Sequence, residues 1–538
     1  MAAPTSTTGT MTATALHHYR GLNSVFTTDT SRPPALGQDR FPGFGEDNPL
    51  DLPALSHPGN ARLVASRMRD GTMDAFFDAL AATGSCAHPV RLVGSSATVD
   101  TATGQVISTF DSRELPFGTL HRPCGNRRAS VCPSCSRVYA RDTYALIHAG
   151  VSGGKAVPEQ VRDNPLLFVT LTAPSFGPVH GHRSGRPCRP RRPESRTRCP
   201  HGRPTWCNRV HDEDDEINGA PLCFECHDTA SAVMWQWHAP ELWRRFTIAL
   251  RRGIARHLSV PDSRLGEHAS IQYAKVAEYQ TRGLVHFHAL IRLDGPADGG
   301  IGSPAPATLD GADLAALVRK VVPSVTVLAD PVDHEDTPRV LAFGAQVDVR
   351  TVRGGSRTDD PSGPLTPDQV AGYLAKYSTK DSSSLHGHGQ GRPHLLALKR
   401  ECREMAGRAA TFHDVDHDYQ RMSQWVRALG FRGHFGTKSR RYSITLGALR
   451  RARSRWQELA AESRRTGTPI DTRDLEARLL ADDADETTQV VGSWTYIGTG
   501  WRDHTEEAMA LAVAARTREY DVWKAQQHTT RNGVQKGE

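Results

Sequence analysis

Hydrophobic and polar positions along the chain follow two different periods, and each period predicts one kind of element. A spacing of three and four residues between apolar positions predicts helices, and strict alternation or a short β-branched run predicts strands. The predicted helices are 60–82, 234–258, 311–322 and 504–527, and the predicted strands are 166–172, 270–280 and 284–293. These signals indicate a chain that contains both helices and strands.

Two stretches follow neither period. Residues 1–59 are rich in Thr, Ala, Pro and Gly, which predicts a disordered tail. Residues 179–230 are rich in Arg, Pro and Cys, and they interrupt the chain between a predicted strand and a predicted helix. We therefore expect an insertion there that something other than an apolar core holds together.

Composition narrows the class of protein. The chain has 538 residues, with 66 Lys and Arg against 59 Asp and Glu, and 10 Cys. It lacks the run of about 18 apolar residues that a membrane span needs, and its first residues do not resemble a secretory signal. So few cysteines in so long a chain do not suit a disulfide scaffold, and their clustering favours metal binding. We expect a cytoplasmic, modestly basic protein that binds metal and no membrane.

The strand at 284–293 carries two histidines on one face. His286 and His288 alternate with apolar residues, so both imidazoles point the same way. A three-residue loop, 281–283, joins this strand to the one before it, and that loop length pairs Glu278 with His286. A two-residue turn would instead bring Gln280 to that face.

Two imidazoles and one carboxylate are half of a metal coordination sphere. They leave positions free for water and substrate, and such mixed ligands admit several divalent ions. Mg²⁺ or Mn²⁺ is favoured where a phosphate shares the site. An exposed pair of histidines on a half-buried strand is the alternative interpretation.

A short helix is strongly signalled at 367–378. Thr366 and Gln369 form a capping box, and Pro367 occupies the first helical position. Tyrosines and lysines follow as two pairs with a spacing of four residues, namely Tyr373 with Tyr377 and Lys376 with Lys380. A buried tyrosine stripe with solvated lysines is one explanation. The other is chemical, because a tyrosine oxygen attacks phosphorus when cations stabilise the developing charge.

Three segments carry a resemblance to a known family. Residues 286–288 (HFH), 168–172 (FVTLT) and 373–380 (YLAKYSTK) are similar to the motifs of HUH endonucleases, which initiate rolling-circle replication or transposition. A closer likeness to the replication initiators of actinobacterial plasmids and integrative elements extends from about residue 60 to near the C-terminus. It rests on 124–135 (CGNRRASVCPSC), 276–283 (VAEYQTRG) and 432–442 (RGHFGTKSRRY).

The resemblance implies a strand-specific nick at a plasmid origin, with a tyrosine joined to the 5′ phosphate and a 3′-OH left as primer. It implies that His286, His288 and Glu278 hold the catalytic divalent ion, and that Tyr377 attacks first. Some relatives have a carboxylate where this chain has Tyr373, which favours transfer by two tyrosines. Lys376 and Lys380 would stabilise the developing charge. Origin DNA, a host helicase and a polymerase are the implied partners.

Eight of the cysteines form two groups, each around a Cys-x-x-Cys turn of the kind that binds tetrahedral zinc. The first predicted zinc site is Cys86, Cys124, Cys132 and Cys135. The second is Cys199, Cys207, Cys223 and Cys226, with His201 and His211 as alternative ligands. Cys188 and Cys402 are interpreted as ordinary thiols. A zinc ion would supply the folding energy that the unperiodic insertion lacks.

Two basic segments predict contact with DNA. Seven arginines lie between His182 and Arg198, although a solvated charged run explains them equally well. The second segment mixes cations with aromatic residues, which suits phosphates and stacked bases. Its predicted DNA-binding residues are Arg432, Lys438, Arg440, Arg441 and Tyr442.

The resulting expectation is an α+β protein with an antiparallel HUH nuclease sheet that has helices on one face, two zinc-binding modules and a mainly helical C-terminal region. The predicted divisions are a tail (1–59), a zinc-binding module (60–160), the nuclease domain (161–390), a basic region (391–465) and a linker with a helix (466–538). An HUH transposase with paired tyrosines, or a non-catalytic zinc-dependent DNA-binding regulator, is the alternative.

Overall fold

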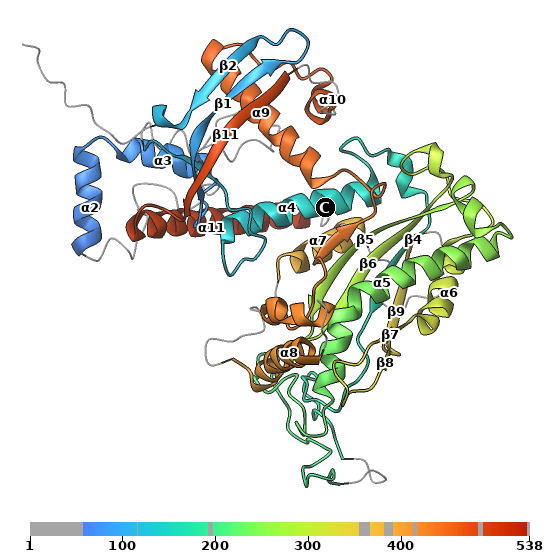
Figure 1. Ribbon diagram of the computed structural model, residues 1–538. Helices are drawn as coiled ribbons and strands as arrows, with labels where there is room; N and C mark the ends of the chain where they lie inside the picture. The colour runs from blue at the N-terminus through green and yellow to red at the C-terminus, as the bar shows by residue number, and fades with distance from the viewer. Residues whose placement is uncertain are drawn as a thin grey trace, which may run out of the picture. The chain divides into compact units, whose positions relative to one another are not determined.

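The computed structural model describes residues 58–534, except for 116, 192–196, 354–365, 381–390, 413–416 and 482–487. Nearly all of the predicted tail 1–59 lies outside the described residues. The chain divides into two compact units, Met1–Tyr139 with Asp483–Glu538, and Ala140–Asp482. Helices and antiparallel strands occur in both, which confirms the α+β class (Figure 1). Among the described helices, none has the length and hydropathy that a membrane span needs.

The first unit is built from both ends of the chain. Strand β11 pairs antiparallel with the whole of β1, and β2 and β3 also pair with β1. Phe76 and Leu80 form a small core with Trp501 and Met509. The elements of this unit are α2 (Pro58–Arg69), α3 (Met73–Ala82), β1 (Val90–Asp100), β2 (Val106–Asp111), β3 (Leu120–Arg122), β11 (Thr488–Thr499) and α11 (His504–Val534).

The second unit contains a five-stranded antiparallel sheet in the order β10-β5-β6-β4-β9. Its register pairs Glu278 with His286, as the loop length predicts. Gly283 has a φ of +84°, the left-handed conformation that the three-residue loop requires. The strands are β4 (Leu166–Leu171), β5 (Ser270–Tyr279), β6 (Val285–Asp294), β9 (Val347–Arg353) and β10 (Gly436–Lys438), with β7 (Thr326–Ala329) and β8 (Arg339–Ala342) as a separate pair.

Helices cover both faces of this sheet, which corrects the expectation of helices on one face. One face, with Phe287 and Ala289, packs under α5 (Thr229–His257), α6 (Gly311–Val321) and α8 (Pro393–Phe412). The other, with Val276 and Leu290, packs against α7 (Pro367–Ser378), the end of α4 (Pro133–Ser152) and the start of α9 (Leu446–Thr466). Both faces carry apolar residues beyond the His pair, so both require cover. A short helix, α10 (Leu475–Leu480), follows α9.

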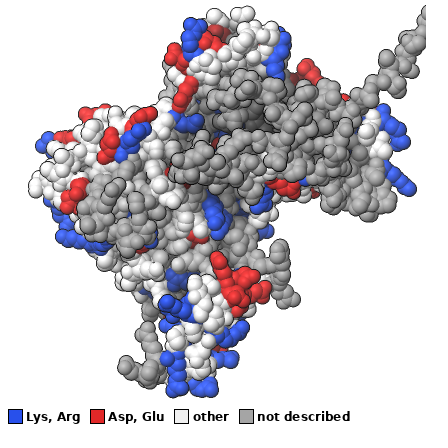
Figure 2. Space-filling model, turned by 180° about the vertical axis from the view of Figure 1, so that it is seen from behind, with Lys and Arg blue, Asp and Glu red and all other residues white. Residues whose placement is uncertain are grey.

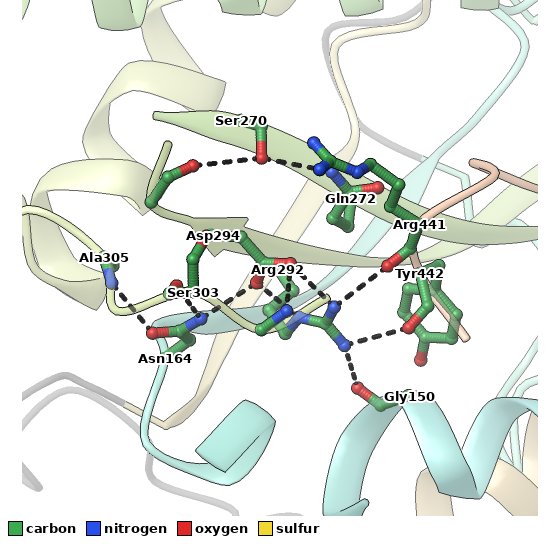
Figure 3. Close-up of polar contacts among 12 residues, drawn as sticks. Gly150, Asn164, Ser270, Gln272, Arg292, Asp294, Ser303, Ala305, Arg441 and Tyr442 are labelled. Carbon is green, nitrogen blue, oxygen red and sulfur yellow. Dashed lines mark hydrogen bonds and ion pairs between the residues drawn. The ribbon is translucent and has the colours of Figure 1, made fainter. Parts of the chain in front are cut away.

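A buried ion pair lies at the far end of β6 from the histidines (Figure 3). Arg292 and Asp294 are fully buried and joined by two contacts, Nε to Oδ1 at 2.6 Å and Nη2 to Oδ2 at 2.8 Å. Asn164 donates to the same carboxylate, while the guanidinium donates to the backbone carbonyls of Gly150 and Tyr442. These bonds connect the sheet to α4 and to the segment that follows β10.

Candidate active site

Glu278, His286 and His288 converge on one face of the sheet. The Oε2 atom of Glu278 lies 3.0 Å from His286 Nε2 and 3.1 Å from His288 Nε2, and the two nitrogens are 3.0 Å apart. His288 is buried, and the other two side chains are largely covered. Adjacent antiparallel strands produce this convergence, because cross-strand partners share a face. The three residues of the sequence prediction therefore lie together.

The pKa shifts of His288 and Glu278 fit a bound cation. Burial lowers the pKa of His288 below its ordinary value, so its imidazole tends to be neutral and able to ligate. Burial raises the pKa of Glu278, but hydrogen bonds from His286 and His288 outweigh burial and hold it below its usual range. Two imidazole nitrogens and a carboxylate oxygen about 3 Å apart share one centre, which a divalent cation would occupy.

Neighbouring strands orient His288. Thr170 on β4 places its Oγ1 3.0 Å from His288 Nδ1, and this hydrogen bond leaves Nε2 directed at the cluster. Phe168 stacks on the imidazole with ring centroids 5.7 Å apart. Asp348 on β9 lies across from Thr170, and its charge raises the pKa of His288, opposing burial. Sequence reasoning missed Thr170 and Asp348; the alternation within 168–172 was the available signal for Thr170.

Helix α7 carries the two tyrosines beside the cluster. Thr366 caps it through the predicted box with Gln369. The hydroxyl of Tyr373 is 3.2 Å from His288 Nε2, and the Tyr373 and Tyr377 rings are 4.5 Å apart. Burial, and then the negative charge of Glu278, raise the pKa of Tyr373 above its ordinary value. Both phenols therefore face the His pair rather than forming a purely apolar stripe.

The lysines of the same segment lie next to Tyr377. The ammonium of Lys380 is 4.4 Å from the centroid of the Tyr377 ring and 3.8 Å from Glu278 Oε1. Lys376 is more exposed, and its ammonium is 5.6 Å from the same ring. Two cations thus accompany two phenols and three side chains that could hold a metal ion on one face of the sheet.

The first predicted cysteine group is assembled in the first unit. Cys86, Cys124, Cys132 and Cys135 place their sulfurs within 4.8 Å of one another. The sulfurs of Cys132 and Cys86 are 3.8 Å apart, and the backbone N–H of Cys124 donates to Cys86 Sγ. Four thiols at such distances match a tetrahedral zinc site, in which adjacent sulfurs are about 3.8 Å apart.

The second predicted group forms with one exchange of ligand. Cys199, Cys223 and Cys226 lie together, but the fourth member is His201, with Nδ1 3.2 Å from Cys226 Sγ and 3.8 Å from Cys223 Sγ. Cys207, placed in this group by the sequence analysis, lies elsewhere in the insertion. The sequence analysis thus named Cys199, Cys223 and Cys226 correctly and had His201 as an alternative ligand, but the sequence pattern did not decide between His201 and Cys207.

The predicted DNA-binding residues in and around β10 differ in their exposure. Tyr442 is fully buried and donates to the carbonyl of Ile147, which corrects the prediction that its ring stacks on bases. Burial lowers the pKa of Lys438 to about 8, and its ammonium donates to three backbone carbonyls. Arg432 pairs with Asp418. Arg440 is exposed and Arg441 is half-buried, and their contact with DNA stays a prediction.

The arginine-rich segment of the insertion presents its charges to solvent. Figure 2 shows Lys and Arg gathered at the lower end of the view, where Figure 1 draws the loops between β4 and α5. Arg192 and Arg196 lie outside the described residues. The exposed arginines of the predicted run are Arg183, Arg186, Arg189, Arg191 and Arg198.

Comparison with known proteins identifies the family. The RepSA family, described as the replication initiator protein of pSAM2, matches residues 72–515. A curated replication initiator protein of Streptomyces ambofaciens is 38% identical over 448 residues, which cover 81% of this chain and 89% of that protein. No solved structure matches the chain. The match spans most of the chain and includes the His pair, the tyrosine helix and the cysteine groups, so the chain belongs to the RepSA family of replication initiator proteins.

Proposed function

We propose that this replication initiator nicks one strand of its plasmid origin through a tyrosine nucleophile. The observation that carries the proposal is the convergence of Glu278, His286 and His288 with the phenol of Tyr373 on one sheet face. A cluster of two imidazoles and a carboxylate has open coordination positions, and phenols beside it can reach a phosphate bound there. Membership in a replication initiator family supplies the biological setting.

The proposed reaction is a transesterification. The phenolic oxygen forms a bond to phosphorus and the bond from phosphorus to the 3′ oxygen breaks, so the phenol loses its proton and the 3′ oxygen gains one. A Mg²⁺ or Mn²⁺ ion held by Glu278, His286 and His288 would polarise the scissile phosphate. The resulting 3′-OH serves as primer, and the protein stays joined to the 5′ phosphate.

We expect Tyr377 to attack first and Tyr373 to serve in a second transfer. The ammonium groups of Lys376 and Lys380 lie beside the Tyr377 ring, where they can stabilise the negative charge that develops at the phosphate during attack. Tyr373 has the opposite setting, because its hydroxyl lies next to the carboxylate of Glu278. Two tyrosines one helical turn apart would permit a first cleavage and a second strand transfer by one chain.

We expect basic side chains elsewhere in the chain to bind DNA, and structural zinc ions to stabilise its fold. Exposed arginines of the insertion, together with Arg440 and Arg441, suit contacts with the phosphate backbone. Two structural zinc ions would occupy the four-cysteine group of the first unit and the group of Cys199, His201, Cys223 and Cys226. We expect the protein to act in the cytoplasm with a host helicase and polymerase.

A nicking assay tests the proposal. Supercoiled plasmid carrying the origin of the encoding element is incubated with the full chain and Mn²⁺, and nicked circles and 5′-linked protein are measured. Tyr377→Phe should abolish the first adduct, and His286→Ala with His288→Ala should abolish nicking. Tyr496→Phe, at an exposed tyrosine of β11, and His257→Ala, on the exposed side of α5, are matched controls that should nick normally.

Each outcome has a defined meaning. If the full chain gives neither nicked circles nor 5′-linked protein, the proposed nicking activity is wrong. A non-catalytic DNA-binding role would then be the better explanation. Adduct formation that survives in Tyr377→Phe and disappears in Tyr373→Phe would reverse the order of the two nucleophiles. Nicking that persists without both histidines would remove the metal site from the mechanism.

A further inference from the structure

A fourth cluster of metal-ligating side chains lies in the insertion between β4 and α5. It combines His180, Cys188, Cys207 and His211, whose ligand atoms all lie within 4.8 Å of one another. Sequence analysis treated Cys188 as an ordinary thiol and assigned Cys207 to another group. We propose that these four residues form a third structural zinc site, in addition to the two cysteine-rich sites of the proposed function.

The distances between donor atoms match tetrahedral zinc. The sulfur of Cys207 lies 3.5 Å from His211 Nε2, and the sulfur of Cys188 lies 3.9 Å from His180 Nδ1. Bonds of 2.3 Å to sulfur and about 2.05 Å to nitrogen, at the tetrahedral angle, place neighbouring S and N atoms about 3.5 Å apart. Two thiols and two imidazoles complete four ligands, as a structural zinc site requires.

His211 is oriented as a metal ligand. Its side chain is fully buried, its Nε2 faces Cys207, and its Nδ1 lies 2.8 Å from Asp215 Oδ2. A carboxylate on the far nitrogen fixes the tautomer that leaves Nε2 free to ligate, a common arrangement around zinc-bound histidines. The ring of His180 meets that of His211 edge to face, with centroids 5.3 Å apart.

The backbone brings the ligands together from distant points of the loop. Arg189 and Cys207 exchange two hydrogen bonds of 2.8 Å, and the N–H of Cys188 donates to Arg209. His180 is bonded in the same way to Gly219 and Ala220. Three short segments, 180–189, 207–211 and 219–220, thus meet at the cluster. The first two contribute the ligands, and the third holds the backbone of His180 in place.

The insertion has little else to hold it. Among its described residues between Ala173 and Ala232, the buried hydrophobic residues are Cys188, Cys207, Ala220 and Cys223. Three of these four are cysteines of the proposed clusters. A segment without an apolar core folds when metal binding supplies the free energy. The third site therefore explains how the described residues 180–191 and 197–211 keep one structure.

Native mass spectrometry of the full chain, purified with zinc present, tests the site by counting zinc ions. Cys188→Ser combined with Cys207→Ser should contain one zinc fewer than the parent. Cys402→Ser, a buried thiol outside every cluster, is the matched control and should keep the parental count. An equal zinc count in the parent and the double variant would overturn the proposal, as would a parental mass showing a disulfide between Cys188 and Cys207.

If the double variant does not fold, a conservative variant tests whether the third zinc site exists. His211→Cys keeps four ligands and adds a thiolate, so it should keep the parental zinc count. Loaded with Co²⁺, it should show stronger thiolate charge-transfer absorption than the cobalt-loaded parent. Absorption equal to that of the cobalt-loaded parent would overturn the proposal. Nicking activity is not part of this readout, so the site stands or falls independently of the proposed function.

Discussion

Lys275 is buried in the second unit, and its replacement by methionine should stabilise the protein. It lies on β5 with its side chain under α5, on the sheet face opposite the His pair. Its ammonium is 4.3 Å from the centroid of the Phe287 ring and 5.5 Å from that of Trp243. Burial lowers the pKa of Lys275 to about 7. The native chain therefore binds this proton poorly, while the unfolded chain binds it well.

The size of the effect follows from the difference in pKa. An unperturbed lysine has a pKa of about 10.4, and each unit corresponds to about 1.4 kcal/mol, so burial costs about 5 kcal/mol near neutral pH. A native pKa of about 7 already includes the attraction between the ammonium and the two aromatic rings. Lys275→Met, which keeps an unbranched chain in the same space, should therefore raise the free energy of unfolding by about 4–5 kcal/mol near pH 7.

The pH dependence has a definite sign. Between about pH 7 and pH 10 the unfolded chain holds the Lys275 proton and the native chain does not, so this residue's contribution makes the parent more stable as pH rises. The advantage of Lys275→Met should therefore shrink toward zero near pH 10. Other titrating groups are common to both proteins and cancel in the difference.

Urea unfolding of the parent and Lys275→Met at both pH values measures the effect. Lys320→Met, an exposed lysine of α6, is the matched control and should change the free energy of unfolding by less than about 0.5 kcal/mol at either pH. A Lys275→Met variant that is less stable than the parent near pH 7, or whose advantage does not depend on pH, would refute the reasoning.

Two further predictions concern the same sheet. Arg292→Met leaves the Asp294 carboxylate buried without its cation, so the free energy of unfolding in urea should fall by about 3–5 kcal/mol, and an unchanged midpoint would mean that the pair contributes nothing. Thr170→Val removes the hydrogen bond that orients His288, so calorimetric titration should show Mn²⁺ binding weakened by about 10–100-fold, with equal affinity counting against an orienting role.

Features set by neighbouring residues could be predicted from the sequence. The pairing of Glu278 with His286 depends on a three-residue loop that ends in Gly283, and glycine is the residue that adopts a positive φ without strain. The start of α7 depends on Thr366 and Gln369, three residues apart. In both places the residues that determine the structure lie close together in the sequence. The local sequence is therefore enough to predict it.

Features set by distant residues could not be predicted. Strand β11 pairs along its whole length with β1, from Val90 opposite Thr499 to Asp100 opposite Thr488, and no local signal marks so remote a partner. Tyr442 has the same basic neighbours in sequence as an exposed DNA-binding tyrosine would have. It is buried because α4 lies over it, with Ile147 accepting its hydrogen bond. Burial on the sheet decides its role, and burial depends on a helix almost 300 residues earlier.

Ligand number and type separate the two kinds of metal site that this chain is proposed to contain. In the cluster of Glu278, His286 and His288 the donor atoms are 3.0–3.1 Å apart, close to the spacing of about 3.0 Å between adjacent ligands of an octahedral ion with 2.1 Å bonds. In the three cysteine-containing clusters the donor distances are 3.2–3.9 Å, a range that includes the separations expected around tetrahedral zinc. An octahedral ion with three protein ligands keeps three positions for water and phosphate, whereas a tetrahedral ion with four has none. The same chain can thus hold a reactive ion on a rigid sheet and inert ions in loops, and the ligand sets themselves favour that division.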